Sequence, residues 1–521
     1  MNNKTIIALD KMTEEEARKM ILECACTKSH QLSEKVAFKI NDLLEDIWLK
    51  GLKEFLQIFK NNLVDVNDIH WMLDPKRTDI SNTLCNYIDR LYARELENID
   101  FVTIMATNGP KGMKKMVDRR NELWIKTKIL AVTVFTTFDD WESIKTLNET
   151  VKHQILKSVK NALEAGVDGI VCSPLEAEML REVYCDYDFE IITPGVRLAD
   201  KEVVWDDQMR ITTPEDAING GSDHIVIWRP ITQSDNKVWT IKRIVAEMEQ
   251  GEFTPSDEAK YAFEKILYTG NWEELLKYIW AIYKRPGNGA YVRLASKLLS
   301  DGYINIGTTE RNFRVLDRAS LEIAEQIQEK WIKADVIMWA QMGSVRLSGF
   351  LGKALDIETS IYTEKDGIEV RTSNEKMARL SELLELVRMK DGEGVDITNF
   401  VDVKDGIDMV LKRHDIDLTD MKIILSEDVV TKWSTIIKMI KLIEDKWWEV
   451  VAVTAVANRT WKDNFNGIPF ISCYEPDPFN LYYDENTPED AREEYPQLPD
   501  GAKKVEKAKN EWNELVASMF S

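Results

Sequence analysis

In the first half of the chain, short apolar stretches rich in β-branched residues alternate with segments of helical periodicity. Each apolar stretch is typical of a strand inside a sheet, and segments such as MTEEEARKMILECA and TVKHQILKSVKNALEAG are typical of the helices between strands. Eight such β–α units in about 245 residues predict a (β/α)8 barrel, an α/β TIM-barrel fold. The predicted strands are 6–10, 36–40, 68–74, 101–106, 129–135, 169–172, 189–195 and 224–228.

A second α/β pattern follows a polar, helical stretch that breaks at Pro and Gly. Its apolar runs lie in DVIMWAQMGSVRLSG, SIYTEK, DMVLKRH, MKIILSEDVVTKWST and EVVAVTAVANR. Acidic, Pro-rich sequence comes after them. We therefore predict a barrel over 1–250, a helical linker over 251–290, a second α/β domain over 291–480 and a C-terminal extension over 481–521.

The composition narrows the classes of function. Of 521 residues, 44% are hydrophobic and 30% charged, a globular balance, and the net charge of −22 disfavours nucleic-acid and membrane partners. No apolar run approaches the roughly 20 residues that span a bilayer, and the start MNNKT is no signal peptide. The sequence therefore predicts a cytoplasmic protein whose partners are small molecules.

Cysteine and histidine spacing gives no sign of a metal site. The six cysteines lack C-x-x-C pairs, and the five histidines lack metal-ligand spacing. We interpret the cysteines as reduced thiols and expect no protein-bound metal.

The densest ionic cluster is LDPKRTDISNT, which follows the third predicted strand. Asp74 and Lys76 lie two residues apart, so an extended strand end projects both side chains to one side. Charges at a barrel mouth are costly unless they pair or meet a charged ligand. A solvated loop is the alternative interpretation. Lys39 ends the second strand and would point into the same mouth, which favours a site.

This segment resembles the D-x-K-x-x-D-I-x-N-T signature of the orotidine 5′-monophosphate decarboxylases. Further segments agree in order over about residues 5–245, namely IIALD, AFKIND, ILAVTVFTT, GVDGIVCSP, IITPGVR, DDQMRITTP and GSDHIVIWRPIT. The resemblance implies a decarboxylation that needs no cofactor. Sugar-phosphate decarboxylases of the same superfamily share the shorter D-x-K-x-x-D and remain an alternative.

The same resemblance implies the roles of the barrel residues. Lys39, Asp74 and Lys76 would form a charged array, in which Lys76 protonates pyrimidine carbon 6 as carbon dioxide leaves. Asp79, the fourth catalytic residue, would reach a neighbouring subunit's site together with Ile80, which implies at least a homodimer. The remaining substrate-binding positions are Asp10 for the ribose, Thr137 for the base, Gln208 and Arg229 for the phosphate, and Thr83 and Pro194.

In the second half, IILSEDVVTKWST combines an acidic strand end with a hydroxyl-rich loop that opens a helix. Taken alone it could be an ordinary acidic strand end. However, SIYTEK and MWAQMGSVRLSG resemble segments of the orotate phosphoribosyltransferases over about residues 290–480. Together the two halves resemble a bifunctional uridine monophosphate synthase with the decarboxylase first and a type I phosphoribosyltransferase domain second.

This second resemblance implies that orotate is joined to phosphoribosyl pyrophosphate (PRPP) with Mg²⁺. Glu427 and Asp428 would bind the ribose hydroxyls, and the loop of Thr431, Lys432, Ser434 and Thr435 would hold the 5′-phosphate at a helix N-terminus. Lys365 of the T-E-K segment and the pair Lys412 and Arg413 would bind substrate as well.

Several tryptophans depart from both patterns, because they stand where the families have glycine. An indole cannot take a backbone conformation, or allow a close approach, that only a residue without Cβ permits. Met105 and Ser81 replace a usual histidine and proline, but neither belongs to the charged array. The tryptophans concerned are Trp205, Trp228, Trp339, Trp433, Trp447 and Trp448.

Two hypotheses explain these tryptophans: a degenerate, non-catalytic nucleotide-binding relative, or a gene in which UGA encodes glycine. The composition favours the second, because the 23 glycines are about 4% of the chain where about 7% is usual, whereas there are 16 tryptophans. The ionic residues of the predicted sites are also intact, although a decaying enzyme should lose them as readily as glycines.

Overall fold

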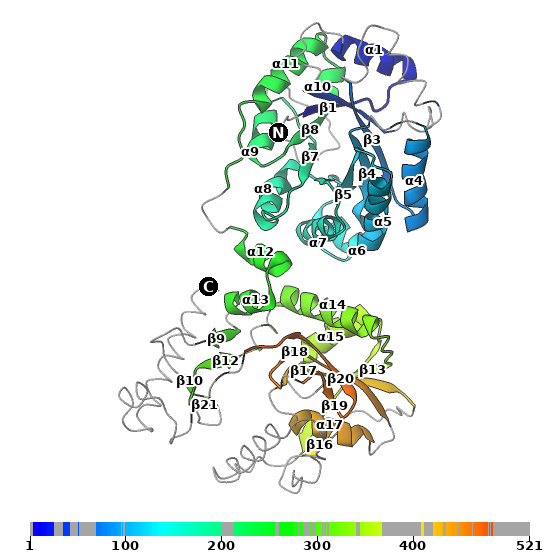
Figure 1. The fold of residues 1–521 in the computed structure, drawn as a ribbon. Helices are drawn as coiled ribbons and strands as arrows, with labels where there is room; N and C mark the ends of the chain where they lie inside the picture. Colours follow the sequence, from blue (N-terminus) through cyan, green and yellow to red (C-terminus); the bar gives the residue numbers. More distant parts are fainter. Residues whose placement is uncertain are drawn as a thin grey trace. The chain divides into compact units, whose positions relative to one another are not determined.

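The computed structural model forms two compact units, Met1–Thr269 and Gly270–Ser521 (Figure 1). The division falls within the predicted linker 251–290. The described residues are 4–25, 35–41, 51, 69–94, 96, 99–198, 212–255, 260–279, 281–284, 292–293, 299–304, 306, 309, 312–339, 344–366, 408–410, 420–430, 434–444, 448–460, 462–477, 479 and 481–482.

Eight parallel strands of the first unit close into a barrel in chain order, and β8 pairs with β1. The predicted barrel is therefore confirmed. Its strands are β1 (Lys4–Ala8), β2 (Val36–Ile40), β3 (His70–Arg77), β4 (Phe101–Met105), β5 (Lys128–Val132), β6 (Gly169–Val171), β7 (Glu190–Pro194) and β8 (His224–Ile227).

The helices of this unit lie outside the ring of strands (Figure 1). They are α1 (Glu14–Ala25), α4 (Ser81–Ala93), the 3-10 helix η3 (Ala106–Asn108), α5 (Gly109–Glu122), α6 (Asp140–Leu147), α7 (Val151–Glu164), α8 (Pro174–Val183), α9 (Pro214–Asn219), α10 (Arg229–Thr232), α11 (Lys237–Met248) and α12 (Ala262–Thr269).

The barrel interior is filled by one apolar cluster to which most strands contribute. It contains Ala37 of β2, Met72 of β3 and Phe101 of β4, all buried. Side chains of a strand alternate between its two faces, so the residue two positions after each of these also points inward. The carboxyl ends of β2, β3 and β4 therefore direct one inward residue each to the barrel mouth.

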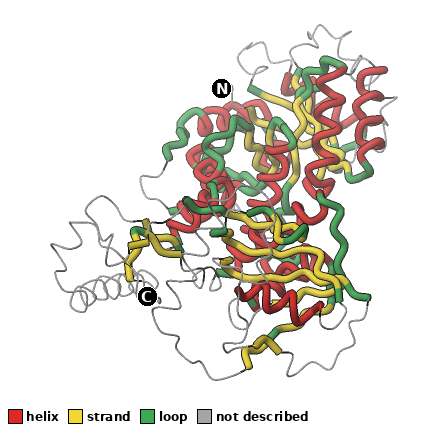
Figure 2. Tube along the Cα trace, turned by 60° about the horizontal axis from the view of Figure 1, so that its bottom comes forward, coloured by secondary structure: helices red, strands yellow, loops and turns green. Residues whose placement is uncertain are grey.

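The second unit contains a six-stranded sheet in the order β14-β13-β17-β18-β20-β19, whose strands lie side by side in Figure 2. All its pairings are parallel except that of β19 with β20. The strands are β13 (Val336–Trp339), β14 (Thr359–Tyr362), β17 (Lys422–Val430), β18 (Glu449–Asn458), β19 (Asn464–Phe465) and β20 (Ile468–Tyr474).

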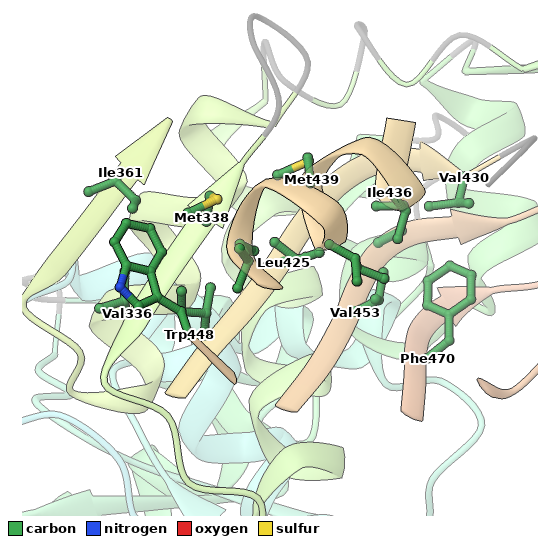
Figure 3. Close-up of a cluster of buried hydrophobic side chains, with 14 residues drawn as sticks. Val336, Met338, Ile361, Leu425, Val430, Ile436, Met439, Trp448, Val453 and Phe470 are labelled. Carbon is green, nitrogen blue, oxygen red and sulfur yellow. The ribbon is translucent and has the colours of Figure 1, made fainter. Parts of the chain in front are cut away.

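The helix that follows β17 covers one face of this sheet. In α17 (Ser434–Glu444), Ile436, Met439, Ile440 and Ile443 are buried, the spacing of an amphipathic helix. They pack with strand residues such as Leu425 in one cluster (Figure 3). The remaining elements of the unit are α13 (Trp272–Tyr278), β9 (Ile282–Lys284), β10 (Val292–Arg293), β11 (Leu299–Ser300), β12 (Gly302–Ile304), α14 (Phe313–Glu329), α15 (Val345–Leu355), β15 (Glu364–Asp366), β16 (Asp408–Val410) and β21 (Leu481–Tyr482).

Four of the five apolar runs predicted for this domain lie in the sheet as β13, β14, β17 and β18, to which the sheet adds β20 and β19. The fifth run, DMVLKRH, instead forms β16, which pairs with β15 in a separate two-stranded sheet. β9, which lies in the predicted linker, pairs with β12 of the predicted second domain. β21, which lies in the predicted extension, pairs with β11 of the same domain. Among the described helices, none combines the length and apolarity needed to cross a membrane.

Candidate active site

Four charged side chains meet at the mouth of the barrel. Lys39 Nζ lies 2.9 Å and 3.0 Å from the two carboxylate oxygens of Asp10, and 3.1 Å from Asp74 Oδ2. Lys76 Nζ contacts the same Asp74 oxygen at 2.6 Å. Four of the predicted barrel residues are therefore brought together: Lys39, Asp74 and Lys76 form an alternating array of ammonium and carboxylate groups, with Asp10 at its end.

The strand register explains why these residues converge. Lys39 follows Ala37 by two positions and Asp74 follows Met72 by two, so both continue the inward faces of β2 and β3. Lys39 is also the register partner of Ala8 in β1, two residues before Asp10. The sequence pattern alone therefore predicts an array at this end of the barrel.

Lys76 reaches the array by another route, because β3 is irregular where it ends. The pairing of β3 with β4 shifts between Leu73 and Arg77, and Lys76 has φ +43°. Such a left-handed backbone is strained for a residue with a side chain and persists where its surroundings hold it. Thr103 of β4 provides this support: its hydroxyl accepts a hydrogen bond from Lys76 N at 3.0 Å and donates one to Asp74 Oδ1 at 2.8 Å.

Burial strengthens the electrostatics of the array. The side chains of Lys39 and Asp74 are 8% and 6% exposed. Burial alone would lower the pKa of Lys39, but attraction to Asp74 and Asp10 outweighs it, so the pKa is raised and the ammonium form is stabilised. The Lys76 side chain is 32% exposed, which leaves its ammonium accessible to a ligand. The array can therefore present a fixed positive charge and a proton donor to a molecule in the mouth.

Asp79 and Ile80 lie apart from this array. Both are exposed, Ile80 at 72%, just before α4. The backbone N–H of Asp79 donates to Asn108 Oδ1 at 3.0 Å, while the Asn108 side-chain amide donates to the carbonyls of Arg77 and Met105. The Asn108 side chain thus holds the loop after β3 through hydrogen bonds to the backbone of Arg77 and Asp79. The sequence did not indicate this role.

Most of the other predicted barrel positions follow strands of the barrel in the chain. Pro194 is the last residue of β7 and half-buried, Thr137 is an exposed turn residue after β5, and Thr83 lies in the first turn of α4. Arg229 begins α10 after β8. Gln208 lies outside the described residues.

Trp228 lies directly beside Arg229. Its ring centroid is 5.0 Å from Arg229 Cζ and 5.4 Å from Lys11 Nζ, and the indole packs against the barrel cluster. The indole therefore fills space next to the cation to which the resemblance assigns the substrate phosphate.

Five of the residues predicted for the second site lie among the described residues. Glu427 is buried and Asp428 half-buried near the end of β17, and α17 is the next described helix in the chain. Burial raises the pKa of the Asp428 carboxyl, although hydrogen bonds from backbone N–H groups, including that of Val429, oppose this shift. Ser434 and Thr435 begin α17, and Lys365 lies in β15. Lys412, Arg413, Thr431 and Lys432 lie outside the described residues.

The backbone corrects part of the argument about tryptophan. Trp228 has φ −123°, and neither Trp339 nor Trp448 is among the described residues with positive φ. Trp339 lies in regular register in β13, and Trp448 packs in the core of the second unit. A left-handed backbone is therefore not a reason to expect glycine at these three positions. The remaining reason is that a ligand would have to approach the backbone closely there. Trp205, Trp433 and Trp447 lie outside the described residues.

Among the described residues, no group of three or more His, Cys, Asp or Glu side chains could hold a metal ion.

Comparison with known proteins places the barrel in a family. Residues 3–244 match the family model described as "Orotidine 5'-phosphate decarboxylase / HUMPS family". The orotidine 5′-phosphate decarboxylase of Staphylococcus aureus is 41% identical over 174 residues, which are 33% of this chain and 73% of that protein.

Two solved structures are also similar to the chain. The orotidine 5′-phosphate decarboxylase of Lactobacillus acidophilus is 28% identical with a TM-score of 0.38, over 47% of this chain and 99% of that one. Leishmania donovani UMP synthase is 14% identical with a TM-score of 0.36, over 91% of each chain.

Proposed function

Because the chain belongs to the orotidine 5′-phosphate decarboxylase / HUMPS family, we propose that its barrel converts orotidine 5′-monophosphate to uridine 5′-monophosphate. The observation that carries this proposal is the array of Lys39, Asp74 and Lys76 at the barrel mouth. The reaction leaves a carbanion at pyrimidine carbon 6, and a preorganised ammonium is the group that stabilises and protonates it.

The proposed step uses only groups of the array. The bond between carbon 6 and the carboxylate breaks, its electron pair stays on carbon 6, and carbon dioxide leaves. Lys76 then donates a proton to carbon 6 and regains one from water. Lys39 holds Asp74 in place, and Asp74 in turn holds the Lys76 ammonium at 2.6 Å. The step needs no cofactor.

Within the proposal, Asp10 binds the ribose, Thr137 the base, and Gln208 with Arg229 the phosphate, while Thr83 and Pro194 line the substrate site. Asp79 and Ile80 complete the site of a second copy in a homodimer or a larger homo-oligomer. Their exposure before α4 supports this role. We place the enzyme in the cytoplasm, with small molecules as its partners.

For the second unit we propose the preceding step, transfer of the phosphoribosyl group of PRPP to orotate. The parallel sheet whose strand β17 carries Glu427 and Asp428 supports this assignment. These carboxylates suit the ribose hydroxyls, and Mg²⁺ would arrive with the diphosphate of PRPP. Lys365, Lys412 and Arg413 would bind substrate, and the loop before α17 would hold the 5′-phosphate.

The assay that tests both activities starts from orotate, PRPP and Mg²⁺ and follows orotate, orotidine monophosphate and uridine monophosphate separately. The chain as written is compared with one that carries Trp228→Gly, Trp339→Gly and Trp433→Gly. Uridine monophosphate formation supports the proposal. If neither chain consumes orotate nor decarboxylates added orotidine monophosphate, the proposal is wrong, and turnover of a pentulose or hexulose phosphate instead would identify a sugar-phosphate decarboxylase.

Replacing both Glu427→Gln and Asp428→Asn is expected to slow orotate consumption about 100-fold, because two charge-assisted hydrogen bonds to the ribose become neutral. Decarboxylation of added orotidine monophosphate by the same variant should equal that of the parent, since the barrel is untouched. Unchanged orotate consumption would contradict the role of these two carboxylates.

A further inference from the structure

Thr103 occupies the place in β4 that faces the irregular end of β3. Leu73 pairs with Val102 and Arg77 with Ile104, so one residue of β4 stands opposite Asp74, Pro75 and Lys76. That residue is Thr103, which is fully buried. It follows Phe101 of the barrel cluster by two positions and therefore points inward as Lys39 and Asp74 do.

The Thr103 hydroxyl holds two parts of the array at once. It accepts from the backbone N–H of Lys76 at 3.0 Å and donates to Asp74 Oδ1 at 2.8 Å. The other Asp74 oxygen is left for the two ammonium groups, at 3.1 Å and 2.6 Å. The hydroxyl thus fixes both the rotation of the Asp74 carboxylate and the left-handed backbone of Lys76.

We propose that Thr103 is a positioning residue for decarboxylation, which acts by holding Asp74 and Lys76 in register. This inference rests on the proposed function of the barrel. Without the hydroxyl, the Lys76 backbone is free to leave φ +43°, and its ammonium moves away from the reacting carbon. Moving the proton donor away from the reacting carbon lowers the rate of the chemical step more than it lowers the affinity for the nucleotide.

The test compares Thr103→Val, which keeps the shape but removes the hydroxyl, with Thr103→Ser, which keeps the hydroxyl. Thr103→Val is expected to lower kcat for orotidine monophosphate about 10- to 100-fold, with the Kd of uridine monophosphate within about threefold of the parent. Thr103→Ser should recover most of kcat. The matched control is Thr127→Val, because Thr127 is also buried but its hydroxyl has no hydrogen-bond partner among the described residues.

Two results would overturn the inference: parental kcat in Thr103→Val, or equal losses in the Val and Ser variants, which would indicate packing of the methyl group. A parent chain without turnover would instead reject the proposed function. In that case crystal structures still test Thr103, since the inference expects Lys76 to lose its contact with Asp74 in Thr103→Val, and an unchanged contact contradicts it.

A second, independent observation concerns the ends of two helices. Trp124 follows α5 and Trp331 follows α14, each with φ +57° and with 90% and 89% of its surface exposed. The left-handed region is strained for a residue with a bulky side chain, and an exposed indole gains little burial to offset that strain.

The hydrogen bonds identify these ends as Schellman motifs, whose left-handed position is usually glycine. Trp124 N donates to Asn121 O at 3.1 Å, and Ile125 N donates to Arg120 O at 3.2 Å. The end of α14 repeats the pair, from Trp331 N to Gln328 O and from Ile332 N to Ile327 O.

Glycine occupies the same position at other helix ends of this chain. Gly166 after α7 has φ +79° and Gly221 after α9 has φ +96°, and both close the same pair of bonds. Asp356, which has φ +58° after α15, belongs to a residue type that tolerates this region. The two tryptophans are therefore the exceptions among these helix ends.

We infer that positions 124 and 331 are built for glycine and that the living protein carries glycine there. Neither position depends on a resemblance to any family, because both are singled out by the backbone at the ends of α5 and α14. Positions 124 and 331 therefore extend the hypothesis that UGA encodes glycine. At these two positions the backbone conformation, rather than sequence similarity, favours glycine.

Mass spectrometry of the chain purified from its own cells tests this inference directly. Peptides that contain positions 124 and 331 should have the mass of glycine, encoded by UGA; the mass of tryptophan, encoded by UGG, would overturn the inference.

A stability measurement tests the geometry on the chain as written. Trp124→Gly and Trp331→Gly are each expected to raise Tm by about 2–4 °C, whereas Trp124→Ala, which keeps Cβ, should gain less. The controls Trp141→Gly and Trp239→Gly replace exposed tryptophans inside α6 and α11 and should lower Tm. A lower Tm for both Trp124→Gly and Trp331→Gly would contradict a position built for glycine.

Discussion

Replacing Lys76 with alanine is expected to lower the rate of orotidine monophosphate decarboxylation by at least about 1,000-fold. The variant removes the ammonium that lies 2.6 Å from Asp74 and that protonates carbon 6 in the proposed step. A positioned proton donor contributes roughly 10²- to 10⁴-fold, and charge stabilisation in a water-poor site adds to it. The measurement is single-turnover formation of uridine monophosphate at saturating substrate.

The control for this variant is Lys114→Ala. Lys114 is 62% exposed on α5 and pairs with Asp118 on the same helix, so its removal should leave the rate within about twofold of the parent. A Lys76→Ala chain that turns over within tenfold of the parent would show that another group donates the proton.

Replacing Lys39 with methionine is expected to lower the free energy of unfolding of the barrel by about 3 kcal/mol, because the buried Asp74 and the partly exposed Asp10 lose the cation that they share. Lys39 joins Asp10 to Asp74, and Asp74 is 6% exposed. The measurement is urea denaturation, monitored by hydrogen exchange in the barrel strands. The double variant Lys39→Met with Asp74→Asn should recover part of the loss, since it removes the stranded charge.

The contribution of Lys39 to the free energy of unfolding should fall at high pH. The pKa of Lys39 is raised in the folded protein, so its stabilisation is fully present below the unfolded lysine pKa of about 10.4 and is lost as pH rises through the higher folded value. Lys114→Met, the exposed control, should cost less than about 1 kcal/mol at any pH. Equal losses in the Lys39 and Lys114 variants would contradict the stabilising role of the array.

The barrel could be predicted from the sequence because eight apolar runs alternate with helical segments, and the core of its site because side chains alternate between the two faces of a strand. Strands β2 and β3 contain continuous buried runs, and because successive side chains point to opposite faces, Lys39 and Asp74 share the inward face of Ala37 and Met72. Thr103 was missed, because a β-branched residue such as Thr in FVTIM is common in any strand, whether or not it has a role in a site. The signal was present, however, since Thr103 shares its face with Phe101.

Other features depended on backbone geometry that no residue pattern states. The irregular pairing that turns Lys76 toward Asp74 and the fastening of the following loop by Asn108 appear only in the folded chain. The same is true of the tryptophans. Sequence similarity singled out Trp228 and Trp339, whose φ values are not left-handed, and overlooked Trp124 and Trp331, whose φ values are.

The most direct test of the central claim is conversion of orotidine monophosphate to uridine monophosphate and carbon dioxide by the whole chain. The measurement is made on the chain as written and on Trp228→Gly, each with and without Lys76→Ala. We predict product from the Trp228→Gly chain and its loss when Lys76 is also replaced. Nucleotide binding without turnover, in both the chain as written and Trp228→Gly, would contradict the account and identify a non-catalytic nucleotide-binding protein.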